Sequence, residues 1–355
     1  MYIKSVLSHF GGWQKLTEQH SQEYQELSQI INDLVLDETF QDQGKLKSKR
    51  NRSLSTNSQL LYSTKFVDKW VDKQFMLRGW HPEDLNRRLF LGKKPNSLYR
   101  YTELDALKRC VGVDVTFSKF AFAESCIFVK FPIFSQAKRI DIGVLIVPMD
   151  DTRKLFQPGV SGFEMLKDRI KALAFLPIKY PLAILGISNT IVENIDIEEL
   201  TSPLDRFFVE NLGLTLSEMK LQTERPAYDF KIELPTESEK VAKEICALAN
   251  LDKGGYILIG LRNDGDIVGI LRNTVDTVQL RISHIAHDNV NPNPEIEFRI
   301  FDHPSNDNRC VLVVRVIAVQ RKPCIANDRV YVRTGNEAVA AKPDEIRKLV
   351  LGSGA

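Results

Sequence analysis

Two carboxylates nine residues apart, Asp105 and Asp114, give the N-terminal half its clearest chemical signal. Asp114 lies in the segment 111–117, where apolar side chains alternate with other types, as in a strand with two distinct faces. Thr116 then shares a face with Asp114. Two carboxylates at the end of a sheet can hold Mg²⁺ (or Mn²⁺), and a polar neighbour can steer a water molecule. The pattern therefore fits metal-dependent phosphodiester hydrolysis.

The same side chains also fit plain structural roles. Asp105 would then cap a turn in the segment 103–106, and Asp114 would face solvent on an edge strand. A further aspartate, Asp141, sits in the apolar segment 140–147, where an unpaired carboxylate would be costly to bury. We expect Asp141 to be hydrogen-bonded for structural reasons and assign it no catalytic role.

A second pair of charged residues, Asp229 and Lys231, occurs in the C-terminal third. In a strand these two share one face, while Phe230 and Ile232 point to the core. A carboxylate beside an ammonium group can bind a metal and a phosphate. The alternative is a surface ion pair of little energetic weight, which the spacing alone favours.

Strands and helices that position Asp114 can be predicted from the hydrophobic pattern. We expect strands over residues 111–117, 140–147 and 182–187, with a helical stretch over 163–174 before the last strand. Strand, helix and strand in this order predict an α/β sheet with helices on its faces.

The chain ahead of this sheet is polar. Residues 1–60 are mostly helical in pattern, and a helix over 61–80 is expected to end near Gly79. The basic run from Lys45 to Arg52 is expected to be a solvated loop, and a mobile basic arm that contacts nucleic acid would look the same.

The C-terminal third reads as a separate unit. Residues 191–219 carry a local acidic excess and are expected to form short connecting helices. The turn at 263–265 is typical of a β-hairpin. The other elements expected in this unit are strands at 228–234, 256–261, 296–301, 311–319 and 330–333, and helices at 237–250 and 343–351.

Composition limits the class of protein. The chain has 355 residues and a net charge of only +2, so a strongly basic body is absent and nucleic-acid contacts must come from local clusters. The five cysteines are scattered, without CxxC spacing, which favours a reducing compartment. The N-terminal segment lacks the apolar core of a signal peptide, and no apolar run is long enough for a membrane span. We therefore expect a cytoplasmic protein that contacts no membrane.

Three ordered segments make the N-terminal signal more specific: VGVDVTFSKF (111–120), FP (131–132) and IDIGVLIVP (140–148). Through these segments, residues 55–190 resemble restriction endonucleases of the BglII and BstYI kind, which have the PD-(D/E)xK nuclease fold. The resemblance implies that the family's metal-binding aspartate maps onto Asp105. It also implies that the family's Glu-x-Gln is replaced by Asp114-x-Thr116, which leaves two possibilities: an altered nuclease, or a decayed one that only binds.

The C-terminal third contains an ordered set of short segments: ERPAYDFK (224–231), ICALAN (245–250), GGYILIG (254–260), DG (264–265), VG (268–269) and YVRTG (331–335). This set resembles the Schlafen AlbA-like domain over roughly residues 215–350. Members of that family range from nucleic-acid binders to RNA-cleaving enzymes.

The nuclease members of the Schlafen family share a three-acid site. By this resemblance, Glu224 and Asp229 match the first two acids. The third position holds Arg262 or Asn263, and Asp264 follows one step later. The resemblance also makes two cations, Lys231 and Arg333, candidates for contact with phosphate.

These observations predict two domains. Residues 1–190 are expected to form a restriction-endonuclease-like α/β domain, a mixed sheet flanked by helices, with a helical N-terminal arm. Residues 191–219 are expected to be an acidic connector, and residues 220–355 an α+β Schlafen AlbA-like nucleic-acid-binding domain.

Three functions remain open at this point. The first is a Mg²⁺-dependent endonuclease, possessing catalytic residues Asp105, Asp114 and Thr116 and acting on DNA rather than RNA, with a defence or restriction role implied by the resemblance. The second is a non-catalytic DNA- or RNA-binding regulator, and the third is an RNase that acts through the C-terminal domain. A homodimer is expected because members of both families commonly pair and duplex cutting needs two active sites.

Overall fold

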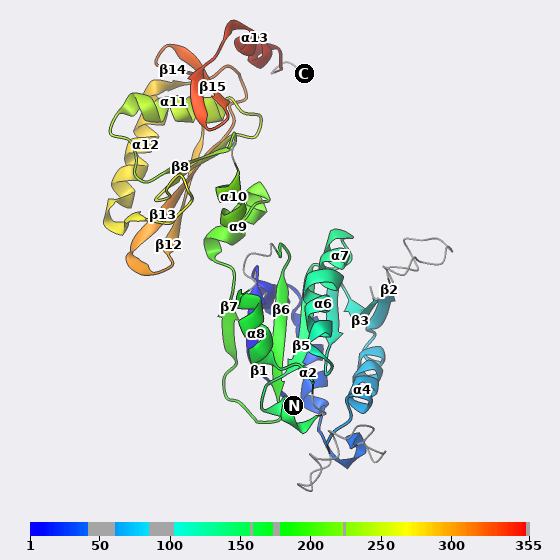
Figure 1. Ribbon diagram of the computed structural model, residues 1–355. Helices are drawn as coiled ribbons and strands as arrows, with labels where there is room; N and C mark the ends of the chain where they lie inside the picture. Colours follow the sequence, from blue (N-terminus) through cyan, green and yellow to red (C-terminus); the bar gives the residue numbers. More distant parts are fainter. Residues whose placement is uncertain (42–60, 85–102, 157–158, 173–177, 223–224, 353–355) are drawn as a thin grey trace. The chain divides into compact units, whose positions relative to one another are not determined.

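The computed structural model describes residues 1–41, 61–84, 103–156, 159–172, 178–222 and 225–352, and these form two compact units, Met1–Thr201 and Ser202–Ala355 (Figure 1). The basic run at Lys45–Arg52 and the candidate acid Glu224 lie outside the described residues. In the described parts, no helix has both the length and the apolar character that a bilayer crossing needs.

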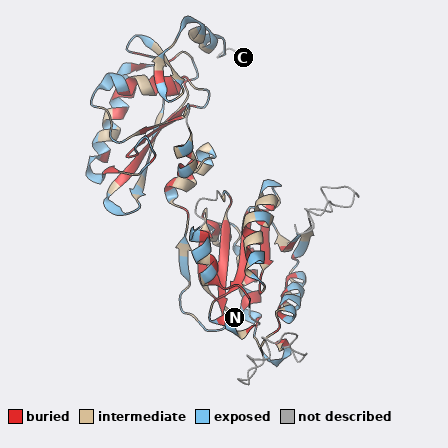
Figure 2. Cartoon of the chain, viewed as in Figure 1, coloured by how far each residue is buried: buried red, intermediate tan, exposed pale blue. Residues whose placement is uncertain are grey.

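A seven-stranded mixed sheet forms the centre of the first unit. Its strand order is β2-β3-β4-β5-β6-β1-β7. Strands β4, β5 and β6 run parallel, and β3 pairs antiparallel with β4. Strands β5 and β6 are buried throughout (Figure 2), as their continuous apolar sequences predict. The strands are β1 (Tyr2–His9), β2 (His81–Asp84), β3 (Glu103–Lys108), β4 (Val111–Val115), β5 (Ile142–Pro148), β6 (Leu182–Ser188) and β7 (Asp196–Glu199).

Helices cover both faces of this sheet. On one face, α2 and α4 bury apolar side chains such as Leu27 and Phe75 against the strands. On the other face, the helical stretch from α6 to α7 and the helix α8 contribute Phe131 and Leu166 to a second core. The mixed sheet flanked by helices is therefore confirmed. The helices are α1 (Gly12–Gln14), α2 (Ser21–Asp33), α4 (Thr64–Leu77), α6 (Phe120–Ser125), α7 (Phe131–Gln136) and α8 (Phe163–Ala172).

The N-terminal residues correct one expectation. Residues 2–9, expected within a helical arm, form strand β1, which pairs antiparallel with β6 and parallel with β7. Its side chains are buried on both sides of the sheet, with Val6 in one core and Leu7 in the other. A strand of this kind has no strict alternation, so short-range periodicity does not distinguish it from a helix. Within the same N-terminal segment, the helix expected from the apolar spacing is present as α2.

The second unit combines two smaller sheets with helices, which confirms the α+β expectation. One sheet has the order β10-β13-β9-β8, with β12 paired to β13, and the other has the order β11-β14-β15-β16. Its strands are β8 (Tyr228–Lys231), β9 (Gly255–Ile259), β10 (Ile270–Leu271), β11 (Val290–Asn291), β12 (Ile296–His303), β13 (Asn306–Val316), β14 (Ile325–Ala326), β15 (Arg329–Thr334) and β16 (Glu337–Ala340). Its helices are α9 (Pro203–Leu212), α10 (Leu216–Leu221), α11 (Ser238–Ala249), α12 (Val275–Asn289) and α13 (Pro343–Gly352).

The acidic stretch 191–219 contributes to both units. Strand β7 at its start extends the first sheet through β1. Helices α9 and α10 then pack on the second unit, where Phe208 and Met219 share a core with Phe230. Apolar residues within this stretch therefore belong to the cores on either side.

Candidate active site

Asp105 and Asp114 face each other across two neighbouring strands. Ala106 of β3 lies opposite Val113 of β4, so the antiparallel register continues to Asp105 opposite Asp114. Each carboxyl group is close enough to the other to influence its pKa. Asp105 Oδ2 also accepts a hydrogen bond of 2.8 Å from the backbone N–H of Val115. The hairpin therefore brings the two predicted metal ligands together.

Both carboxylates line one cavity of about 250 Å³. A second cavity, of about 770 Å³, shares Asp72, Asp105, Phe122 and Lys130 with the first and is otherwise lined largely by apolar side chains. The polar residues that line the smaller cavity are Asp68, Asp72, Asp105, Asp114, Thr116, Ser118 and Lys130. The three residues predicted to be catalytic thus share a cavity, together with others that the sequence analysis did not select.

Burial dominates the electrostatics of the acid pair. Burial, followed by the charge of Asp114, raises the pKa of Asp105 to about 8. Burial also raises the pKa of Asp114, against the opposing effect of the Lys130 ammonium group, whose Nζ lies 2.8 Å from Asp114 Oδ2. Two close carboxylates with little water around them favour either a shared proton or a bound cation.

Lys130 was not selected from the sequence. It ends a π-helical segment, Cys126–Lys130, between α6 and α7, and its side chain is only 18% exposed. Burial would lower the pKa of Lys130, but the neighbouring Asp114 carboxylate raises it overall. A signal was available in the sequence, because Lys130 is a lone cation within the largely apolar segment 126–134.

Helix α4 contributes two more carboxylates that the sequence analysis passed over. Asp68 and Asp72 are four residues apart on α4, which places them on one helix face. Partial burial and the Asp72 charge raise the pKa of Asp68 to about 6, and partial burial also raises the pKa of Asp72. Both side chains line the smaller cavity. The i, i+4 pair of acids was the available signal.

Thr116 lies just beyond the end of β4. Its backbone N–H donates to the carbonyl oxygen of Ile146 at 2.9 Å, which extends the ladder toward β5. Its hydroxyl is 2.8 Å from the Ser118 hydroxyl, and the residue is 4% exposed. Thr116 therefore adds a neutral hydroxyl to the cavity wall.

The acid pair fits a hard divalent cation in donor chemistry. Carboxylate oxygens are the ligands that Mg²⁺ prefers, and Mg²⁺ commonly takes one or two carboxylates and keeps several waters. Asp105 and Asp114 supply such a pair, and a cation between them would offset the repulsion that raises the pKa of Asp105. Among the described residues, no three His, Cys, Asp or Glu side chains form a ready-made metal cluster. Water or phosphate oxygens would therefore complete the coordination.

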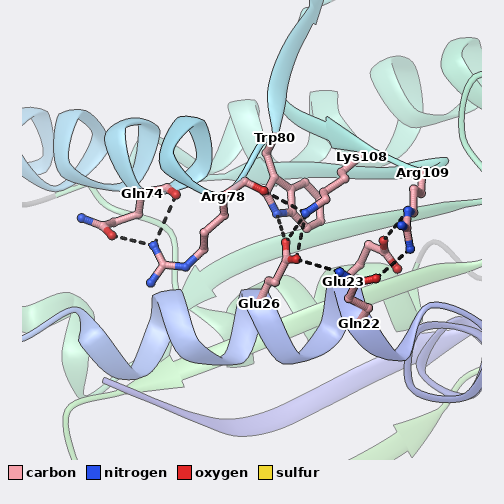
Figure 3. Close-up of polar contacts among 8 residues, drawn as sticks. All are labelled: Gln22, Glu23, Glu26, Gln74, Arg78, Trp80, Lys108 and Arg109. Atoms are coloured by element: carbon pink, nitrogen blue, oxygen red, sulfur yellow. Dashed lines mark hydrogen bonds and ion pairs between the residues drawn. The ribbon is translucent and has the colours of Figure 1, made fainter.

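A partly buried polar network fixes the opposite end of the β3–β4 hairpin (Figure 3). Glu26 of α2 accepts hydrogen bonds from Trp80 Nε1 at 2.8 Å and from Lys108 Nζ at 2.7 Å. Lys108 also donates to the carbonyl oxygen of Arg78 at 2.8 Å. Although burial would raise it, hydrogen bonds from Lys108 and Trp80 keep the pKa of Glu26 below its ordinary value. The network ties the end of β3 that lies away from Asp105 to α2.

The C-terminal candidates form a charge-balanced cluster. Lys231 Nζ lies 2.7 Å from Asp229 Oδ2, and these side chains are 28% and 12% exposed. A third residue, Glu244 of α11, was not selected from the sequence. Its pKa is raised by burial and by the Asp229 charge, against the opposing charges of Lys231 and Arg333. Two acids and two bases therefore compensate one another.

Arg333 corrects one expectation. Its guanidinium is fully buried, with 0% of the side chain exposed, and donates to Glu244 Oε2 at 2.8 Å. It also donates to the carbonyl oxygens of Arg225 and Tyr228. All these partners are internal, so Arg333 supports the fold in this structure and does not face a phosphate. The phosphate contact was inferred from the family resemblance, and a single sequence does not show which face of β15 is covered by α11.

In the turn expected to hold a third acid, Arg262 and Asp264 both form hydrogen bonds with Asp266 of the same turn. Arg262 is bonded through its backbone N–H to the carbonyl oxygen of Asp266 at 2.9 Å. Asp264 accepts from the N–H of Asp266 at 3.0 Å. Such a bond within a turn is a common role of aspartate.

Two known protein families match this chain, one in each half. Residues 4–187 match the family model of the restriction endonuclease BglII/BglIII, and residues 224–342 match the Schlafen AlbA_2 model. No curated protein matches significantly.

Among solved structures, the chain is similar to a crystal structure of the restriction endonuclease BGLII complexed with a DNA 16-mer. The identity is 12%, the TM-score is 0.38, and the match covers 56% of this chain and 82% of that one. It is also similar to the DIP2311 protein from Corynebacterium diphtheriae, with 20% identity and a TM-score of 0.28 over 37% of this chain and 24% of that one. Since the first family model spans more than half of the 355 residues, the chain belongs to the restriction endonuclease BglII/BglIII family and carries a Schlafen AlbA_2 region behind the endonuclease domain.

Proposed function

We propose that the protein is a Mg²⁺-dependent endonuclease acting on DNA, with its active site in the N-terminal unit. One observation carries the proposal: Asp105 and Asp114, on adjacent strands, line a single cavity together with Thr116 and Lys130. Membership of the BglII/BglIII family supports the reaction class and the choice of DNA.

Each residue of the cavity has a definable part in phosphodiester hydrolysis. Asp105 and Asp114 would hold Mg²⁺ (or Mn²⁺), which supplies Lewis-acid polarisation of the phosphate and a more acidic bound water. The Val115 N–H fixes one oxygen of Asp105 in place before substrate arrives. The hydroxyls of Thr116 and Ser118, which lie 2.8 Å apart, would orient a water molecule by hydrogen bonding.

We assign nucleic-acid binding to the C-terminal unit, with Lys231 as a phosphate contact and Asp229 as its ion-pair partner. Glu224, which lies outside the described residues, is included in this proposed site on the resemblance alone. The Schlafen AlbA_2 match supports this assignment, and Lys231 keeps a partly exposed ammonium group while paired with Asp229. Arg333 holds this face together from inside. A cytoplasmic location and a role in defence or restriction belong to the same proposal.

We further propose a homodimer, because cutting both strands of a duplex at one place needs two active sites. Sedimentation velocity at micromolar concentration measures this directly. A mass of about twice 40.5 kDa is expected, and a monomeric mass would count against the dimer.

The test of the function uses purified protein with genomic DNA and, separately, with structured RNA. Each substrate is incubated with Mg²⁺, with Mn²⁺ or with a chelator. Cutting of DNA that needs the metal and vanishes in Asp114→Ala supports the proposal. Sequencing the new ends also reveals any target sequence, which removes the need to guess one.

A non-catalytic nucleic-acid-binding protein is the second candidate. The observation that favours it is that Asp114 already has a cationic partner, Lys130, while Thr116 is neutral. Tight, salt-sensitive binding without cutting would support this candidate. Cutting of RNA that survives Asp114→Ala but not Asp229→Ala would instead place an RNase site in the C-terminal unit.

A further inference from the structure

Lys130 has a place in the site that the proposed function leaves unexplained. Among the described residues that line the two cavities, it is the only cation. Every other charged residue among these described lining residues is a carboxylate: Asp68, Asp72, Glu103, Asp105 and Asp114. A phosphodiester entering this cavity would meet strong negative charge, and a metal ion held by two carboxylates offsets only part of it.

The position of Lys130 is fixed by the packing on either side of it. The π-helical segment that ends at Lys130 begins with Cys126, which is 1% exposed, and is followed by Phe131 and Phe134, which are both 0% exposed. Segments of this kind interrupt a helix and are frequent at functional sites. The backbone of Lys130 is therefore held by buried neighbours, while its Nζ reaches the cavity and contacts Asp114.

Thr116 cannot supply the positive charge that Lys130 brings to the cavity. Its side chain is neutral, and its hydroxyl is already within hydrogen-bond distance of Ser118. A lysine ammonium group carries a full charge and three donors on a flexible stem, so it can leave one oxygen for another nearby. If Asp114 held a metal ion, its negative charge would be partly neutralised by that ion. The carboxylate would then attract the Lys130 ammonium group less strongly.

We propose that Lys130 is a catalytic residue that moves from Asp114 to a non-bridging oxygen of the scissile phosphate and stabilises the charge that develops there. The inference rests on the proposed function. In the step, a water oxygen forms a bond to phosphorus, and the bond from phosphorus to the leaving sugar oxygen breaks. The water gives one proton to solvent, and the leaving oxygen takes one up. Lys130 keeps its proton throughout and acts through its charge.

Lys108 provides a matched control for this lysine. Lys108 and Lys130 have the same side-chain exposure, 18%, and each is paired with one carboxylate in the same unit. Lys108 lines neither of the two cavities and bonds to Glu26 at the far end of β3. Lys108→Met therefore removes a partly buried lysine–carboxylate pair of the same unit without touching the proposed site.

The experiment compares wild type, Lys130→Met, Lys130→Arg, Lys108→Met and Asp114→Ala. Two quantities are measured: the kcat for DNA cutting with Mg²⁺, and the rise in Tm that Mn²⁺ causes without DNA. Lys130→Met is expected to lower kcat about 100-fold or more while Mn²⁺ still raises Tm, since both metal carboxylates remain. Lys130→Arg should recover part of the loss, and Lys108→Met should cut within a few-fold of wild type.

The outcomes separate this inference from the proposed function. If Lys130→Met and Lys108→Met cut DNA with the same kcat, the proposed role of Lys130 is wrong, while the proposed nuclease function is unaffected. Loss of the Mn²⁺ effect in Lys130→Met would also overturn it, because Lys130 would then act only by holding Asp114. No cutting by wild type, or equal cutting by Asp114→Ala, would overturn both. If Lys130→Met does not fold, Lys130→Gln, which can still donate to Asp114, takes its place with the same readings.

Discussion

Asp105 Oδ2 accepts a 2.8 Å hydrogen bond from the N–H of Val115, the residue that directly follows Asp114. One carboxylate is thereby held beside the other. Burial, followed by repulsion from the Asp114 charge, raises the pKa of Asp105 to about 8. Keeping Asp105 ionised costs stability, and we expect Asp105→Asn to remove that cost. The amide can still accept from Val115, so the geometry is kept.

The gain in the free energy of unfolding that we expect from Asp105→Asn depends on pH. Between the ordinary pKa of 3.8 and the folded value near 8, the folded state binds more protons than the unfolded state, so stability falls as pH rises. In chelator, Asp105→Asn should gain roughly 3 to 5 kcal/mol at pH 8 and clearly less at pH 5, measured by urea denaturation. An equal gain at both values would show that Asp105 is not held at a raised pKa.

Cutting should increase with pH up to about 8. Asp105 must lose its proton to bind a metal ion, and its pKa of about 8 leaves most of it protonated at pH 6. A metal ion competes with the proton, so higher Mg²⁺ should move the midpoint of the rate profile to lower pH. A rate that is flat between pH 6 and 8 at low Mg²⁺ would contradict this expectation.

The two units are expected to divide their work. Asp114→Ala should abolish cutting, because one of the two carboxylates that would hold the metal is lost. Asp229→Ala should weaken binding or change target choice and leave some cutting. Cutting rates and salt-dependent binding to DNA measure the two effects separately. RNA cutting that persists in Asp114→Ala while Asp229→Ala is inactive would show that the C-terminal unit is the enzyme.

Arg333 and Lys231 should behave differently despite their proximity. Arg333→Met leaves Glu244 as a buried carboxylate without its guanidinium partner, which costs about 3 to 5 kcal/mol of stability. Lys231→Met removes a partly exposed ammonium group, so stability should change by about 1 kcal/mol and nucleic-acid affinity should fall. Denaturation and binding assays on both variants check this, and equal destabilisation by the two substitutions would refute the distinction.

Local sequence patterns determined much of the fold. Strands β5 and β6 follow from continuous apolar runs of strand length, and α11 follows from an apolar stripe at helical spacing. Asp114 and Thr116 could be placed on one strand face because side chains alternate along a strand. Strand β1 was missed, since burial on both faces removes that alternation.

The composition of the candidate site was decided by tertiary structure. The sequence supplied Asp105, Asp114 and Thr116, which lie close together along the chain. Lys130 on the helix after β4 and Asp68 on α4 come to the same cavity through packing on opposite faces of the sheet, which no local periodicity records. Arg333 shows the same limit in reverse: the family resemblance suggested a phosphate contact, and only the packing of α11 over β15 made it an internal partner of Glu244.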